Sequence, residues 1–268
     1  MSTRLNAITG ANVSLDVENV VLRCKRRETV FLTPPWTMSF RRGDHVAILS
    51  SSRRMRDVFI GSLYGLVAPV SGSIVSHGTV SWPVGLKGGL DGKLTLIQNL
   101  RFLAGVYEEL LAPLNVERFL QTFLDLAGLS SGQMLKDLKS KDQKMFFAIA
   151  SLAFSFDTFL VPTAQFLQGG VKDKLVQCIK AVFEDRIENR CMITSTTNKD
   201  FQKQYCNKGI VIDEAGAMAF QGDLNECYGW LEAASDSVSK EEDDSVDESV
   251  FLEELSNEDR DPELLDII

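Results

Sequence analysis

Histidine and cysteine are scarce in this chain of 268 residues. The only histidines are His45 and His77, so histidine-based catalytic triads and histidine-rich metal sites have little material to work with. The five cysteines are odd in number and show no CxxC spacing, which disfavours both a disulfide framework and a structural zinc site. We therefore expect cytosolic thiols and no bound metal. The cysteines are Cys24, Cys178, Cys191, Cys206 and Cys227.

Long apolar runs are also missing. No stretch of about 18 apolar residues occurs, and the N-terminus has no apolar segment of the kind found in signal peptides. Neither a spanning helix nor a signal peptide is predicted, so we expect no direct insertion into a membrane, and any membrane contact has to go through a partner. Nucleic acid is not an expected partner either.

The acidic charge is concentrated at one end of the chain. The net charge is −9, and the residues from Ala233 onward hold fourteen Asp or Glu against Lys240 and Arg260, which makes −12 and leaves +3 for the rest. With 44% hydrophobic residues, the remainder can bury a sizeable core. We predict a folded unit over residues 1–233 and an acidic, solvated tail over 234–268.

Apolar strands alternate with helical patterns, which favours a mostly parallel sheet with helices on its faces. Residues 13–22 and 36–40 indicate a β-rich N-terminal section, and an inserted helical subdomain is expected at about 94–155. Further strands are predicted at 45–49, 72–74, 79–82, 158–161 and 190–194, with a hairpin at 210–213 and 218–220. Helices are predicted at 54–64, 142–154, 171–187 and 223–233.

One stretch carries a specific resemblance. Ser81-Trp82-Pro83-Val84-Gly85-Leu86, followed by Gly88-Gly89 and by Leu94-Thr95 with Asn99, is similar to the ATP-binding subunits of ABC transporters that export capsular polysaccharide and lipopolysaccharide. The match covers all but the first dozen residues and the acidic tail. It implies the ABC ATPase fold: a P-loop core sheet, an N-terminal antiparallel β subdomain and an inserted helical subdomain.

The phosphate loop of that family is degenerate here. A working GxxxxGK[ST] loop uses glycines to turn backbone N–H groups toward phosphate, a lysine for the outer phosphates and a hydroxyl for magnesium. In this register Ser50, Arg53 and Met55 replace the glycines, Arg56 replaces the lysine and Asp57 replaces the hydroxyl residue. Asp57 is expected to cap the following helix. The candidate nucleotide-binding residues are Ser51, Ser52, Arg53, Arg54, Arg56 and Asp57. Clustered arginines at a helix start can hold an anion, so we expect no resident cofactor and at most weak binding of ATP.

The other motifs implied by the resemblance have also changed. Pro162 and Thr163 stand where the family has the magnesium aspartate and the catalytic glutamate, and Ser195 replaces the switch histidine. Lys139-Ser140-Lys141-Asp142 occupies the position of the signature loop, Asp91 that of the Q-loop glutamine, and Gln168-Gly169 that of the aspartate after the Walker B strand. We predict no catalytic residue and no metal site.

The resemblance also implies a partner. In the family, the region around Trp82, Pro83 and Asp91 leads into the loop that abuts the membrane subunit, so these three residues are candidates for partner docking. The alternative for Trp82 and Pro83 is ordinary packing.

Three functions are open at this point. The first is a non-hydrolysing ABC ATPase homologue that serves a polysaccharide exporter as a structural or regulatory subunit, bound to the permease, to a competent ATPase or to a second copy of itself on the cytoplasmic face of the inner membrane. The second is an energising ATP-binding subunit whose hydrolysis is supplied by a competent partner. The third is a cytosolic protein-interaction module unrelated to transport.

Overall fold

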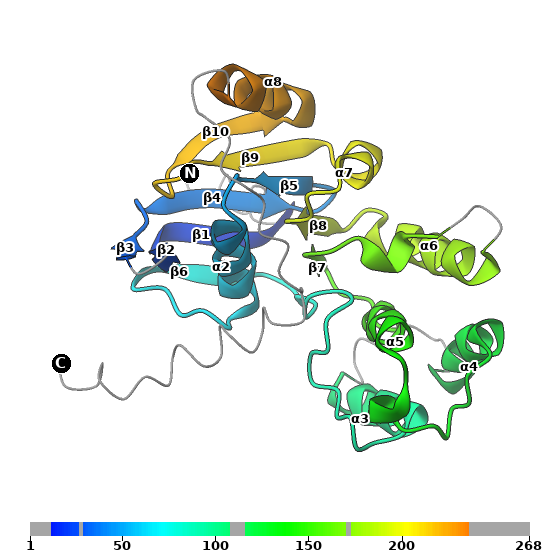
Figure 1. The fold of residues 1–268 in the computed structure, drawn as a ribbon. Helices are drawn as coiled ribbons and strands as arrows, with labels where there is room; N and C mark the ends of the chain where they lie inside the picture. The colour runs from blue at the N-terminus through cyan, green and yellow to red at the C-terminus, as the bar shows by residue number, and fades with distance from the viewer. Residues whose placement is uncertain (1–11, 27–28, 108–115, 170–172, 236–268) are drawn as a thin grey trace, which may run out of the picture.

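The computed structural model describes residues 12–26, 29–107, 116–169 and 173–235. These residues form a β-rich half and a helical half (Figure 1). Helix α2 lies among the strands, α3, α4 and α5 lie together away from the sheets, and α8 lies beside β10 (Figure 1). The predicted tail begins inside α8 (Leu224–Ser235), and its residues 236–268 lie outside the described part.

The core sheet has five strands in the order β10-β9-β5-β8-β7. Strands β5 (His45–Leu49), β7 (Thr158–Val161), β8 (Cys191–Thr194) and β9 (Lys208–Ile212) are parallel, and β10 (Met218–Asp223) pairs antiparallel with β9. Strands β7 and β8 are buried at every position, which explains their unbroken apolar sequences. The predicted mostly parallel sheet is confirmed.

The N-terminal section is antiparallel, as predicted. Strand β1 (Val13–Val21) lies between β4 (Trp36–Arg41) and β6 (Ser71–Ser76). Between β1 and β4 the chain forms a separate hairpin of β2 (Arg23–Arg26) and β3 (Thr29–Leu32), which the sequence patterns did not predict. Helix α2 (Arg53–Tyr64) follows β5 and ends at Gly65.

The helical subdomain contains α3 (Leu96–Val106), α4 (Val116–Ala127), the short 3-10 helix η3 (Leu135–Asp137) and α5 (Ser140–Leu152). Helix α3 begins with a capping box, in which the side chains of Thr95 and Gln98 each accept a hydrogen bond from the other's backbone N–H. After β7 come η4 (Gln165–Leu167), α6 (Lys174–Ile187) and, after β8, α7 (Lys199–Tyr205).

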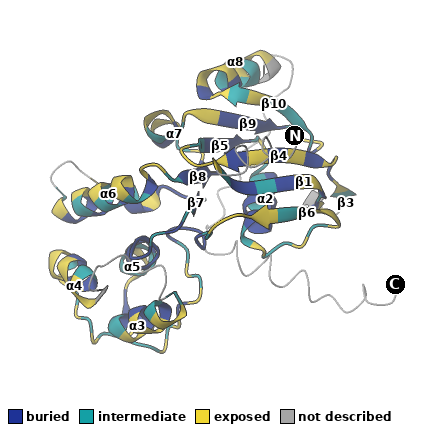
Figure 2. Cartoon of the chain, turned by 180° about the vertical axis from the view of Figure 1, so that it is seen from behind, coloured by how far each residue is buried: buried dark blue, intermediate teal, exposed yellow. Residues whose placement is uncertain are grey.

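Two large apolar clusters form the cores of the two halves. One fills the helical half and extends under β7 and β8, and the other lies between the N-terminal strands, α2 and β5. Figure 2 shows buried residues along the core strands and exposed residues on the outward faces of α3, α4 and α6. Burial on one helix face and exposure on the other is the pattern expected for helices that cover a core.

The predicted strand at Thr79–Trp82 is wrong. Here the backbone follows β7 with only one isolated bridge, between Val80 and Thr158. A few backbone hydrogen bonds join the two segments, among them Ser81 N–H to the Thr158 carbonyl and Thr158 N–H to the Thr79 carbonyl. Side chains add to them: Asp157 accepts hydrogen bonds from the N–H and hydroxyl of Thr79, and the Ser81 hydroxyl accepts from the N–H of Leu160. The next residue after this segment is Pro83, which has no N–H to continue a ladder.

Trp36 of β4 connects the N-terminal sheet to the turn between β9 and β10 of the core sheet, and its substitution tests how much this contact stabilises the fold. Its indole N–H donates to the carbonyl oxygen of Gly216 over 2.8 Å, and its side chain is buried against Phe59. Trp36→Phe should lower the free energy of unfolding by about 1–3 kcal/mol, because the buried carbonyl loses its donor. Urea denaturation followed by circular dichroism measures the change. The exposed aromatic Phe102 is the control, since Phe102→Ala should change it by less than about 0.5 kcal/mol. Equal effects of the two substitutions would contradict this assignment.

Candidate functional site: the carboxyl edge of the parallel sheet

Three segments with altered motifs meet at one edge of the core sheet. The register pairs Ala47 of β5 with Thr194 of β8, and Thr194 with Val161 of β7. The residues that follow these parallel strands therefore share the carboxyl edge, where open α/β sheets bind their ligands. The structure thus brings Ser50–Ser52, Pro162–Thr163 and Ser195 to the same edge.

Helix α2 begins early. A phosphate loop lies between its strand and its helix, yet here the helix starts at Arg53, three positions before Arg56, which stands in the lysine position. Ser52 is the N-cap, and its side chain accepts a hydrogen bond from the N–H of Met55 over 3.3 Å. The Ser52 carbonyl accepts the N–H of Arg56. Backbone N–H groups that would surround a phosphate are bonded within the first helical turn.

Met55 occupies the third glycine position and is 2% exposed. It lies in the cluster between the N-terminal strands and α2, with its sulfur 3.8 Å from the Cys24 sulfur of β2. A glycine at this position would bury no side chain, so Met55 adds a packing interaction that fixes the start of α2. Restoring the loop conformation would expose this side chain.

Arg56 bonds to its own loop. One of its terminal guanidinium N–H groups donates to the carbonyl oxygen of Ser50, and the Ser52 N–H donates to the Ser50 hydroxyl over 3.3 Å. These contacts close the turn between β5 and α2. The Arg56 guanidinium, which stands in the lysine position, therefore binds a backbone carbonyl of its own turn.

Asp57 does not cap the helix, which corrects the expectation from sequence. It lies in the second turn, and its carboxylate accepts from the Arg53 Nε, four residues earlier, over 3.4 Å. Ser52 has the capping role because a cap must precede the first helical residue. The Asp57 side chain is only 20% exposed. Burial raises the pKa of Asp57 to about 6, although Arg53, Arg56 and Arg54 act in the opposite direction.

The positions after β7 and β8 hold hydroxyl groups and a proline. Thr163 and Ser195 are both buried, and the Thr163 hydroxyl accepts the N–H of Gln165. Thr194 donates its hydroxyl to the Val161 carbonyl over 2.6 Å, which ties the ends of β7 and β8 together. None of these side chains is a carboxylate or an imidazole, so none can polarise water as an acid or base.

The remaining motif positions lie away from this edge or on the surface. Lys139 is the N-cap residue of α5 without a side-chain capping bond, and Ser140 begins the helix. Asp91 is exposed, and its carboxylate accepts the N–H of Lys93 over 2.8 Å. The loop that starts at Asp91 is positioned by Asn99.

Asn99 is a site residue whose role the sequence patterns did not predict. It is fully buried, accepts the Asp91 N–H and donates to the carbonyls of Asp91, Leu94 and Thr95. The sequence contained one signal for this role: Asn99 is an amide at an apolar, core-facing position of α3. A buried amide needs hydrogen-bond partners for its donors and its acceptor, so it is expected to hold nearby backbone.

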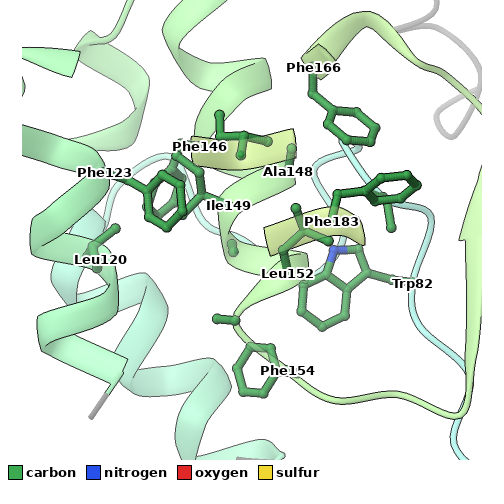
Figure 3. Close-up of a cluster of buried hydrophobic side chains, with 14 of the residues drawn as sticks. Trp82, Leu120, Phe123, Phe146, Ala148, Ile149, Leu152, Phe154, Phe166 and Phe183 are labelled. Atoms are coloured by element: carbon green, nitrogen blue, oxygen red, sulfur yellow. The ribbon is translucent and has the colours of Figure 1, made fainter. Parts of the chain in front are cut away.

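Trp82 and Pro83 are both buried, with Trp82 2% exposed. Trp82 packs against Tyr107, Phe154 and Phe156 at centroid distances of 5.5, 5.8 and 5.6 Å, and Figure 3 shows it beside Leu152 and Phe154. A direct docking contact by these two side chains is not possible in this conformation. Their burial fits the packing alternative.

Two searches of the described residues bear on cofactor and membrane binding. No group of three or more His, Cys, Asp or Glu side chains within them is placed to hold a metal ion. Within the same ranges, none of the helices is long and apolar enough to cross a membrane.

Comparisons with curated proteins find similar ATP-binding proteins. The chain is 27% identical over 188 residues to the ATP-binding protein BexA of Haemophilus influenzae, a match that covers 70% of this chain and 83% of BexA. It is 26% identical over 216 residues to the capsule polysaccharide export ATP-binding protein CtrD of Neisseria meningitidis, covering 80% and 96%. The polysialic acid transport ATP-binding protein KpsT of Escherichia coli matches at 26% over 187 residues, covering 70% and 84%. The chain is thus similar to ATP-binding proteins of capsule polysaccharide export and polysialic acid transport.

Solved structures give the same fold. The ATP-binding subunit of an ABC transporter aligns with a TM-score of 0.63 at 16% identity, covering 91% of this chain and 99% of that one. A dimeric ATP-binding cassette, MJ0796, bound to ADP and phosphate aligns with a TM-score of 0.59 at 14% identity, covering 78% and 98%. No protein-family model matches the chain. The predicted ABC ATPase fold is thus confirmed.

The raised pKa of Asp57 predicts a pH dependence of stability. An unfolded aspartate titrates near about 3.9, so between about pH 4 and pH 6 the folded chain holds a proton that the unfolded chain has lost, and stability falls as the pH rises through this window. Asp57→Asn removes this titration. The difference in unfolding free energy, wild type minus variant, should fall by about 2 kcal/mol from pH 4 to pH 7.

Chemical denaturation at pH 4, 5, 6 and 7 measures both proteins. A difference that stays constant across these values would show that the Asp57 carboxyl is not buried in the folded chain.

Proposed function

We propose that this chain is a non-hydrolysing ABC ATP-binding subunit homologue that serves a polysaccharide exporter as a structural or regulatory subunit. The observation that carries the proposal is the early start of α2 at Arg53. A helical turn capped by Ser52, anchored by buried Met55 and closed by Arg56 occupies the place of the phosphate loop.

The chemistry of phosphoryl transfer supports the absence of hydrolysis. The reaction depends on positioned phosphates, metal ions and groups that stabilise charge. At the carboxyl edge this chain offers Pro162, Thr163 and Ser195 in the positions of the metal ligand, the water-polarising glutamate and the histidine. Asp57 adds a carboxylate where phosphate would need a positive field. Each change opposes catalysis independently of the others.

Partner docking completes the proposal. The chain is related to capsule polysaccharide export and polysialic acid transport proteins, so we propose an exporter permease or a competent ABC ATPase as its partner, with a homodimer as a further arrangement. The docking surface lies near exposed Asp91, on a loop that Asn99 holds from inside. A location at the cytoplasmic face of the inner membrane follows from this partnership.

The rival function is an energising subunit whose hydrolysis a competent partner restores. In an ABC dimer each site combines the phosphate loop of one subunit with the signature loop of the other. This chain has changed both, at Ser50–Asp57 and at Lys139–Asp142, so both composite sites of a heterodimer would be damaged. The free interaction module is the third function, and the homology to transport proteins argues against it.

Nucleotide assays test the proposal directly. The purified full chain should show no magnesium-dependent ATP turnover above background, and calorimetric titration with ATP should give no saturable heat with or without magnesium, because the first-turn N–H groups and Arg56 are already bonded. A competent capsule-export ATP-binding protein measured in parallel is the positive control. Turnover or binding that Arg56→Ala abolishes would overturn the proposal, since Arg56 would then hold phosphate.

Affinity capture from native membranes separates the three functions. Tagged full-length chain should bring down a permease or a second ATPase, and substitution of the exposed Asp91 by Lys should reduce the yield severalfold while leaving the circular dichroism spectrum unchanged. The control is Asp125→Lys on the exposed side of α4. Capture of soluble proteins alone would support the interaction module.

A further inference from the structure

The β2–β3 hairpin presents an unusual outward face. Val30 and Leu32 of β3 are 56% and 53% exposed, although β-branched and leucine side chains at alternate strand positions normally face a core. Between them, Phe31 packs against the cluster of the β-rich half, and Cys24 on β2 is buried. The hairpin thus has one face turned to the core and one face turned away from it.

Cations lie beside these apolar side chains. The register pairs Arg23 with Leu32 and Lys25 with Val30, and directly opposite residues of an antiparallel pair are neighbours on one face. Arg23 is exposed. Arg23 therefore lies on the outward face beside Leu32. Among the described residues β3 pairs only with β2, so its second edge is open to a further strand.

The chain itself contains a segment of matching chemistry. Residues 236–268 hold fourteen Asp or Glu against Lys240 and Arg260, while residues 1–235 sum to +3. Within that segment the apolar residues Val250-Phe251-Leu252 and Leu255 are flanked by Asp247-Glu248 and interrupted by Glu253-Glu254. The segment thus offers apolar and acidic residues to a face that carries two apolar residues and the Arg23 cation.

The connection is long enough. Fourteen residues lie between Ser235 at the end of α8 and Val250, so an extended chain spans on the order of 50 Å from Ser235 to Val250. A folded domain of this size has a diameter of about 45 Å. Covalent linkage also raises the local concentration of the segment to roughly the millimolar range, so weak surface contacts are sufficient for binding.

We propose that residues 247–255 dock on the outward face of the β2–β3 hairpin of the same chain. Val250, Phe251 and Leu252 cover Val30 and Leu32, and the flanking carboxylates pair with Arg23. The open edge of β3 allows the segment to add as a strand, a common mode of peptide recognition. Docking there covers an apolar surface that would otherwise be exposed on a sheet edge, where it favours aggregation.

Hydrogen exchange measured by mass spectrometry on the full-length chain tests this docking. At low salt, backbone amides in 247–255 should exchange on the order of tenfold more slowly than the same segment in a free peptide, as for a segment docked nine-tenths of the time. The effect should weaken in 0.5 M salt, which screens exposed charge pairs, and should not depend on protein concentration.

A charge-reversal pair with a matched control localises the contact. The double variant Arg23→Glu, Lys25→Glu should abolish the protection of 247–255, whereas Lys139→Glu, Lys141→Glu, with the same spacing on exposed residues of the helical half, should preserve it. Phe251→Asp should abolish the protection from the side of the tail. Circular dichroism of each variant confirms that the fold is retained.

Other outcomes overturn the proposal. Absence of protection in the wild type would exclude docking, and protection that survives the hairpin reversal would place the segment on another surface. Protection that grows with protein concentration would show that a second copy is bound. If phosphatidylserine vesicles bind the wild type but not the hairpin variant, and 247–255 remain unprotected, the face binds an anionic membrane instead.

Discussion

The structure around the sheet edge depends on where α2 begins. Ser52 caps the helix, Met55 is buried beneath it and Arg56 closes the preceding turn on Ser50. A capping side chain contributes about 1 kcal/mol, and a buried methionine about 1.5–3 kcal/mol relative to an exposed one. Opening a phosphate cradle would reverse both contributions before any ligand contact formed, so the ligand-free conformation is favoured by the chain's own residues.

The same constraint explains why the rest of the fold persists. Strands β5, β7 and β8 and the apolar cluster around Trp82 and Phe159 do not depend on nucleotide for their burial. Thr194 ties β8 to β7 at the edge where a metal site would otherwise lie. In the function proposed above, the replaced residues at this edge leave a stable scaffold, and such a scaffold is sufficient for a subunit that binds partners.

Regular elements with strong apolar patterns were predictable from sequence. The bounds of β5 and β7 were predicted to the residue, and α2 to within one residue at its start. The β2–β3 hairpin and α7 were missed because both are short, and the hairpin mixes cations with apolar residues instead of following an alternating pattern. The segment at Thr79 was predicted as a strand because its composition does not reveal that its pairing with β7 is limited to an isolated bridge and is supplemented by the side chains of Asp157 and Ser81.

The candidate site was predictable as a set of replaced residues but not as a geometry. Sequence register placed Arg56 and Asp57 in the phosphate loop, yet the position of the N-cap at Ser52 and the closure by Arg56 depend on tertiary packing of Met55 against Cys24.

The most direct measurement is a crystal structure of the full chain grown with magnesium and a non-hydrolysable ATP analogue. The account predicts α2 beginning at Arg53 with the Arg56–Ser50 contact intact and no nucleotide at the sheet edge. An ordered triphosphate held by the backbone of residues 51–56 would contradict it.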